Sequence, residues 1–252
     1  MTGIAQDTLI VGAAVIGGAL NSVAGGGSFF TFPALVMGGL APIAANATST
    51  VALWPGSLAS TWAYRNDVNH MRRQLIQLAV VSVVGGFLGA RLLLWTRNET
   101  FAHIVPWLLL TATTLFAISG RAVAYFRAHN TGTLHPGVLL TGQFLISVYG
   151  GYFGGGMGIL MLATYALAGL TDIHAMNGLK SLLGAAINAA AVVTFIFAGI
   201  VEWRPALLMV AGSLAGGYFG ARLAKRVDAS RVRQLVIATG VVMTIKFFLS
   251  AT

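Results

Sequence analysis

The sequence has no cysteine, and only 8% of its residues carry a charge. The first absence excludes disulfides and cysteine-ligated metal sites. The second excludes an ordinary soluble domain, in which about a quarter of the residues are charged. Acidic residues are the scarcest, with six Asp and Glu against 15 Lys and Arg. All six fall in expected loops or at segment ends, which disfavours proton coupling through a carboxylate buried in a membrane.

Hydrophobic residues make up 57% of the chain, and its mean hydropathy is +0.82. A helix that spans a bilayer needs about 20 residues. The sequence contains ten apolar blocks, at 8–24, 28–41, 46–64, 74–95, 101–120, 137–153, 157–170, 181–199, 205–221 and 234–251. Most of them are long enough to cross, and the two that end at 41 and 170 are short. Because no alternating strand pattern occurs, the sequence predicts an all-α integral membrane protein.

Several function classes lack their motifs. Neither HExxH nor GxSxG occurs, and the five histidines show no metal-ligand pairing at helical spacing. We therefore expect no enzyme, no metal and no cofactor. The basic residues are scattered over short loops and form no continuous face, which disfavours nucleic-acid binding.

The chain contains an internal repeat. The segment 85–91, GGFLGAR, recurs as GGYFGAR at 216–222, 131 residues later. Asn46 and Asn177 are also 131 residues apart, and two glycine triplets are 129 apart. The sequence predicts a first transmembrane repeat at 1–120, an inter-repeat linker at 121–136 and a second transmembrane repeat at 137–252.

The basic residues distinguish two topologies. If each glycine triplet is the bend of a hairpin, three crossings remain per half and the halves are inverted. Eleven basic residues then lie on one side, namely Arg65, Arg72, Arg73, Arg121, Arg127, Lys180, Arg222, Lys225, Arg226, Arg231 and Arg233. The other side keeps four: Arg91, Arg97, Arg204 and Lys246. A topology in which residues 8–41 cross once divides them seven to eight. The positive-inside rule therefore predicts six crossings, two hairpins and both termini outside the cytoplasm.

The two glycine triplets are candidate binding elements. Consecutive glycines leave helical geometry at little steric cost, and the helix that follows presents free N–H groups and a positive dipole end, which suits an anion. Apolar segments broken at matching places in two halves are typical of transporter sites. A tight hairpin or a close helix contact is the alternative explanation. The residues assigned to these breaks are Gly25, Gly26, Gly27, Ser28, Gly154, Gly155, Gly156 and Met157.

A polar stripe follows each triplet on the next helix. The second half places Asn177, Ser181 and Asn188 at spacings that share one helix face. The corresponding stretch of the first half contains Asn46, Thr48, Ser49 and Thr50. These residues are assigned to the same site. Hydrogen bonding between helices is the alternative role for them.

Lys180 is the single residue with the strongest functional signal. It falls one turn into an apolar helix, where its repeat counterpart is the neutral Ser49. A cation inside a membrane is a functional hypothesis by default. The alternative is that its side chain reaches back to the cytoplasmic interface.

These features resemble the sulfite exporter TauE/SafE family of membrane transporters. The resemblance rests on the glycine breaks, the duplicated GGxxGAR and the segment 201–204, VEWR. It implies a multi-pass protein of the plasma (inner) membrane that moves sulfur-containing anions such as sulfite or organosulfonates.

The combined expectation is a secondary transporter that exports a small anion by alternating access. Its expected partners are that anion and the lipid bilayer, and a coupling proton or sodium ion stays open, as does the oligomeric state. A passive anion channel or uniporter and a non-transporting membrane scaffold are the alternatives. Since Ser28 is matched by Met157 and Ser49 by Lys180, we expect an asymmetric site.

Overall fold

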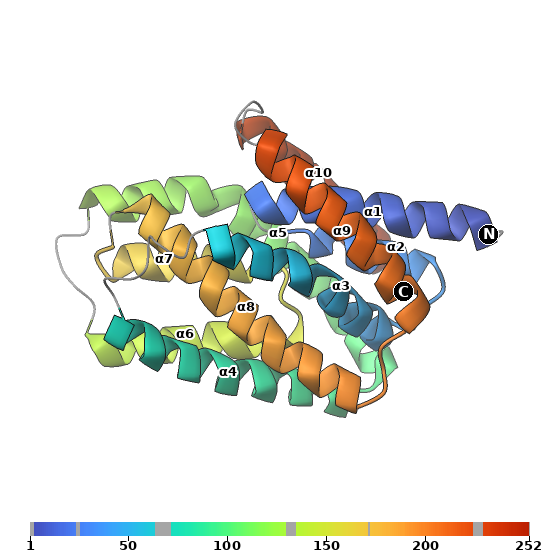
Figure 1. Ribbon diagram of the computed structural model, residues 1–252, viewed down its shortest axis with the longest axis horizontal. Helices are drawn as coiled ribbons and strands as arrows, with labels where there is room; N and C mark the ends of the chain where they lie inside the picture. The colour runs from blue at the N-terminus through green and yellow to red at the C-terminus, as the bar shows by residue number, and fades with distance from the viewer. Residues whose placement is uncertain are drawn as a thin grey trace.

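The computed structural model describes residues 3–23, 26–63, 72–129, 135–170, 172–223 and 229–251. Within these ranges the regular secondary structure is entirely helical (Figure 1). The helices are α1 (Gly3–Val23), α2 (Ser28–Met37), α3 (Pro42–Ala63), α4 (Arg72–Trp95), α5 (Asn98–His129), α6 (Pro136–Tyr152), α7 (Met157–Leu167), α8 (Ile173–Phe197), α9 (Trp203–Leu223) and α10 (Ala229–Ala251). The predicted all-α fold is confirmed.

The two short helices fold back along the helices that precede them. A methyl group on Gly142 of α6 would lie 3.4 Å from the methyl group of Thr164 in α7. In the first half, Gly27 lies so close to α1 that a methyl group there would overlap the carbonyl oxygen of Gly17. With 10 and 11 residues, α2 and α7 are too short to cross a bilayer. The predicted hairpins at the glycine breaks are therefore present.

Helices of each predicted half pack against helices of the other half. The first helix of each half packs against the other half, α1 on α9 and α6 on α4. The contact of α3 with α9 is matched by that of α8 with α4, and α3 also packs on its counterpart α8. Equivalent helices thus have equivalent neighbours, which favours two related halves. Their inverted orientation stays a prediction.

The duplicated GGxxGAR motif brings helix backbones together. A methyl group on Gly151 of α6 would overlap the carbonyl oxygen of Gly86 in α4, and one on Gly216 of α9 would overlap that of Val15 in α1. Small residues permit such close approach in a bilayer, where lipid supplies no hydrophobic drive for helix association. The motif therefore acts in helix packing.

Among the residues that the structure describes, three helical segments are long and apolar enough to cross a membrane by length and composition: Leu75–Trp95, Asn98–Ile118 and Ala175–Phe197. Large apolar side chains face outward, including Phe197 at 89% exposure, which is typical of a protein surrounded by lipid. The number of six crossings stays a prediction. Helix α5 continues to His129, so much of the expected linker is helical.

Candidate functional site

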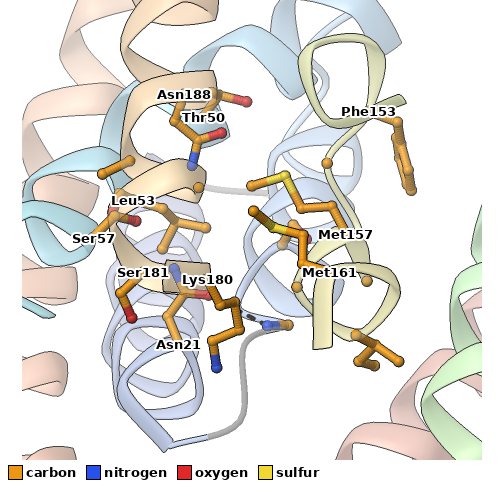
Figure 2. A pocket seen from close by; sticks show the side chains of 18 of the residues that line it. Asn21, Thr50, Leu53, Ser57, Phe153, Met157, Met161, Lys180, Ser181 and Asn188 are labelled. Carbon is orange, nitrogen blue, oxygen red and sulfur yellow. Dashed lines mark hydrogen bonds between the residues drawn. The ribbon is translucent and has the colours of Figure 1, made fainter. Parts of the chain in front are cut away.

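A polar cavity of about 120 Å³ lies between the two broken segments and the helices that follow them (Figure 2). It is lined by the end of α1, by α2 and α3 of the first half, and by α7 and α8 of the second. The polar side chains that line it are Asn21, Ser28, Ser49, Thr50, Ser57, Lys180, Ser181 and Asn188. None of the described lining residues is acidic. The cavity therefore carries a positive charge among neutral hydrogen-bonding groups.

The second glycine break leaves backbone amides available at the start of α7. Gly154 and Gly156 have φ angles of 78° and 76°, in the left-handed region that glycine adopts without steric cost. Gly156 caps α7 without a side-chain hydrogen bond. The amides of Gly156 and Gly158, which both line the cavity, have no acceptor among the described residues. This helix end can therefore donate to an anion.

The first break differs because its amides are already bonded. The side-chain oxygen of Asn21 accepts hydrogen bonds from the amides of Gly26 and Gly27, both at 3.3 Å. At the matching position, 129 residues later, stands Gly150, whose backbone packs against the sulfur of Met157. The two helix starts at the cavity are thus chemically unequal, and the expected asymmetry of the binding site stays a prediction.

Lys180 lies beside the start of α7. Its Nζ donates to Oδ1 of Asn177 at 3.0 Å, and a methyl group on Gly158 would lie 3.1 Å from its Cδ. An ammonium has three donors, so two remain after the bond to Asn177. Figure 2 shows Lys180 and Asn21 on one side of the cavity and Met157 and Met161 across from them. The Lys180 side chain and the free amides of α7 therefore line the same cavity.

Three neutral side chains in the cavity also lack partners. Ser28, Ser181 and Asn188 line it, and their side chains make no hydrogen bond to any residue in the described part of the chain. All three are only partly buried, so their polar atoms are available to water or to a ligand in the cavity. These groups can complete the coordination of a small polar molecule held near Lys180.

The structure brings most of the predicted site residues to this cavity. Those that line it are Gly26, Ser28, Ser49, Thr50, Gly154, Gly156, Met157, Lys180, Ser181 and Asn188. Gly27 and Asn177 do not line the cavity but are hydrogen-bonded to residues that do. Gly27 donates its amide to Asn21, and Asn177 accepts from Lys180. Gly25 lies outside the described residues.

The other predicted residues connect helices. Asn46 donates from Nδ2 to the carbonyl oxygen of Tyr152 at 3.1 Å, and Thr48 accepts from the amide of Glu202 at 3.1 Å. The carbonyl oxygen of Gly155 accepts from the hydroxyl of Tyr149. The contacts of Asn46 and Thr48 agree with hydrogen bonding between segments of the bundle, the alternative role of the polar stripe, and that of Gly155 stays within the second break.

Sequence reasoning did not assign nine of the lining residues to the site: Asn21, Leu53, Ser57, Phe153, Gly158, Ile159, Met161, Gly184 and Ala185. Asn21 had a usable signal, because it is a polar residue inside an apolar segment just before the first triplet. Gly158 had one too, since it extends the second triplet. The apolar residues had none. In the described part, no three His, Asp or Glu side chains come together as a metal site would require.

The family comparison covers nearly the whole chain. The sequence model described as "Sulfite exporter TauE/SafE" matches residues 10–247. No solved structure matches the chain.

Curated relatives are named as membrane transporters. The "Probable membrane transporter protein ORF9" of Sinorhizobium sp is 30% identical over 242 residues, 95% of this chain and 91% of the relative. The "Probable membrane transporter protein YfcA" of Escherichia coli strain K12 is 28% identical over 235 residues, 92% of this chain and 86% of the relative. A "Probable membrane transporter protein" of Haemophilus influenzae is 27% identical over 228 residues, 90% and 88% of the two chains. With its helical fold and outward apolar faces, the chain is a membrane transporter that belongs to the sulfite exporter TauE/SafE family.

Proposed function

We propose that this protein is a secondary transporter of the inner membrane that exports a small anion, sulfite or an organosulfonate, by alternating access. The observation that carries the proposal is the meeting of the Lys180 side chain and the amino-terminal end of α7 at one polar cavity. The two positive elements come from different helices, and each favours an anion by charge and by hydrogen bonding.

The chemistry of the lining narrows the substrate class. No described lining residue carries a negative charge, so a cation would find no counter-charge. The cavity measures about 120 Å³, which suits an anion of a few non-hydrogen atoms. Oxygen atoms of such an anion can accept from Lys180 and from the amides of Gly156 and Gly158. The name of the matching family, sulfite exporter, supports a sulfur-containing anion.

The glycine breaks allow the short helices at the site to change their orientation. Since α2 and α7 are each joined to the preceding helix through glycines with positive φ, at Gly26 and at Gly154 and Gly156, their orientation can change at little steric cost. The halves would then rock around the bound anion, as in other transporters with broken helices. With no acidic lining residue in the described part, Lys180 or a sodium ion bound by oxygen atoms is the candidate for coupling.

The first test is sulfite flux in proteoliposomes with Lys180→Met. Loss of a charged hydrogen-bond donor costs roughly 1.5–3 kcal/mol, so we expect sulfite affinity to fall by about ten- to a hundredfold while membrane insertion is retained. Lys246→Met in α10 is the matched control, because the exposed Lys246 does not line the cavity. Normal flux in Lys180→Met would exclude the assigned role of Lys180.

The same preparation separates the two alternative functions. Flux that ignores imposed sodium and proton gradients would favour a passive channel or uniporter over a coupled exporter. No flux and no thermal stabilisation by sulfite, sulfoacetate, thiosulfate, taurine or simple carboxylates would favour a membrane scaffold.

A further inference from the structure

A second, apolar hollow of about 740 Å³ lies between α4 and α8. None of its lining residues lines the polar cavity, so α8 separates the two. Helix α4 contributes Val83, Phe87 and Arg91, and α8 contributes Ala186, Ala189, Ala190, Val193, Thr194 and Phe197, with Ala198 directly after its end. We refer to this hollow as the α4/α8 groove.

The groove has a small-residue floor and large apolar walls. Three of its ten residues are alanines of α8 and a fourth is Ala198, directly after that helix; Phe87 and Val193 are about half exposed, at 48% and 50%. In the register of the repeat, 131 residues earlier, Ala189 and Val193 correspond to the bulkier Leu58 and Trp62. The open groove is therefore a property of the second half's α8 and not a general consequence of the duplicated motif.

One end of the groove is cationic. Arg91 is exposed, and its guanidinium carbon lies 5.6 Å from the ring centroid of Trp95. In the described part of the chain, no carboxylate lies within ion-pair distance of Arg91; the two ion pairs there join Arg97 to Glu99 and Arg204 to Asp7. The other polar lining residue, Thr194, donates its hydroxyl to the carbonyl of Ala190 at 2.7 Å. Arg91 is thus a charged group of the groove that has no anionic partner among the described residues.

The length of the groove matches one leaflet of a bilayer. Val83, Phe87 and Arg91 stand on successive turns of α4, and eight residues of helix rise about 12 Å. Half of the hydrocarbon core measures about 15 Å. The Trp95 ring beside Arg91 is 73% exposed, and tryptophan is typical of the interface between lipid and water. Arg91 therefore stands at headgroup depth when the apolar part of the groove lies among the acyl chains.

We propose that the α4/α8 groove binds an anionic glycerophospholipid, with one acyl chain over the alanine floor and the phosphate on Arg91. A guanidinium matches phosphate oxygens in a bidentate manner and is held in place here by the tryptophan ring. A second copy of this chain would have to bring a carboxylate to Arg91 within an apolar surface, whereas a lipid phosphate is present at that depth already. Charge complementarity thus favours the lipid.

The test measures retained lipid on the full chain purified in detergent, by native mass spectrometry after incubation with phosphatidylglycerol or phosphatidylcholine. We expect phosphatidylglycerol to be bound more tightly. Arg91→Gln should weaken its binding by about fivefold, in line with the contribution of one basic residue near an anionic surface. Arg97→Gln is the matched control, because Arg97 is a basic residue just after the end of α4 that lies outside the groove.

A second variant tests the apolar part. Ala189→Leu introduces the side chain found at the repeat counterpart and should fill the floor, so that retention of both lipids falls. Equal retention of the two lipids by the unmodified chain, or unchanged phosphatidylglycerol binding in Arg91→Gln, would overturn the proposal. So would a dimer that Ala189→Leu dissociates while lipid retention stays constant, since the groove would then hold a second copy.

Discussion

At the scale of single residues, the interior of the protein contains two kinds of polar side chain, those bonded to each other away from the cavity and those that line it without a partner. Gln143, Ser82 and Tyr165 form a buried network in which Gln143 donates to Ser82 at 2.8 Å and accepts from Tyr165 at 3.2 Å. Asn188 lines the cavity and has no partner in the part of the chain that the structure describes. A paired network stabilises the fold, whereas an unpaired group at a cavity is available to a ligand. Substitutions in the Gln143 network should therefore lower stability, whereas substitution of Asn188 should weaken ligand binding.

For Asn188→Ala we expect weaker substrate binding without loss of stability. The removed carboxamide supplies one neutral hydrogen bond, worth about 1 kcal/mol net, so the half-saturating sulfite concentration in proteoliposomes should rise about fivefold. The thermal unfolding midpoint in detergent should stay close to that of the unmodified protein. An unchanged sulfite dependence together with a large drop in stability would assign Asn188 to the structure instead.

At the scale of helices, glycine serves two purposes that the sequence does not separate. Some glycines bend the chain, as Gly154 and Gly156 do with positive φ. Others let backbones touch, as Gly86 and Gly151 do between α4 and α6. A third kind has no steric demand: a methyl group on Gly56 of α3 would meet nothing within 4 Å. The position of each glycine in the packing therefore decides what its replacement costs.

We expect Gly151→Ala to destabilise the protein and Gly56→Ala to leave its stability unchanged or raised. The added methyl group at Gly151 overlaps the backbone of Gly86, and forced overpacking costs roughly 1–3 kcal/mol. Alanine at the helical position of Gly56 lowers the entropy of the unfolded chain, worth about 0.5–1 kcal/mol. Unfolding in detergent, followed by circular dichroism, measures both. Equal stability of the two variants would contradict the close approach of α4 and α6.

At the scale of the whole molecule, the exchanged packing of α1 with α9 and α4 with α6 ties the two predicted halves together. Neither half can form these two contacts alone. Lys180 lines the cavity, so it belongs to the site and not to a loop. Without it, the basic residues divide ten to four in the inverted topology, which the positive-inside rule still accepts.

We therefore expect both termini outside the cytoplasm. Alkaline phosphatase fused to either end should be active and green fluorescent protein at the same position should be dark, because the first folds only outside and the second only inside the cytoplasm of a bacterial host. A fluorescent amino-terminal fusion would contradict the inverted arrangement. Fusions after Trp95 and after Phe197, at the ends of α4 and α8, should also be active with alkaline phosphatase, because Arg97 and Arg204 fall on the same side as the termini in this topology.

The sequence by itself determined the membrane class, the helical fold, the duplication and the short helices after each glycine triplet, because hydropathy, helix period and repeat register are local properties of the chain. It also identified Lys180, since a cation in an apolar helix is conspicuous without any structure. Only the tertiary structure decided that Asn21 caps the first break, that the start of α7 stays uncapped, and that Met161 and Phe153 complete the cavity. These features depend on which helices meet, and in a bilayer that choice is made by close packing of small residues and by polar pairing, neither of which local sequence specifies.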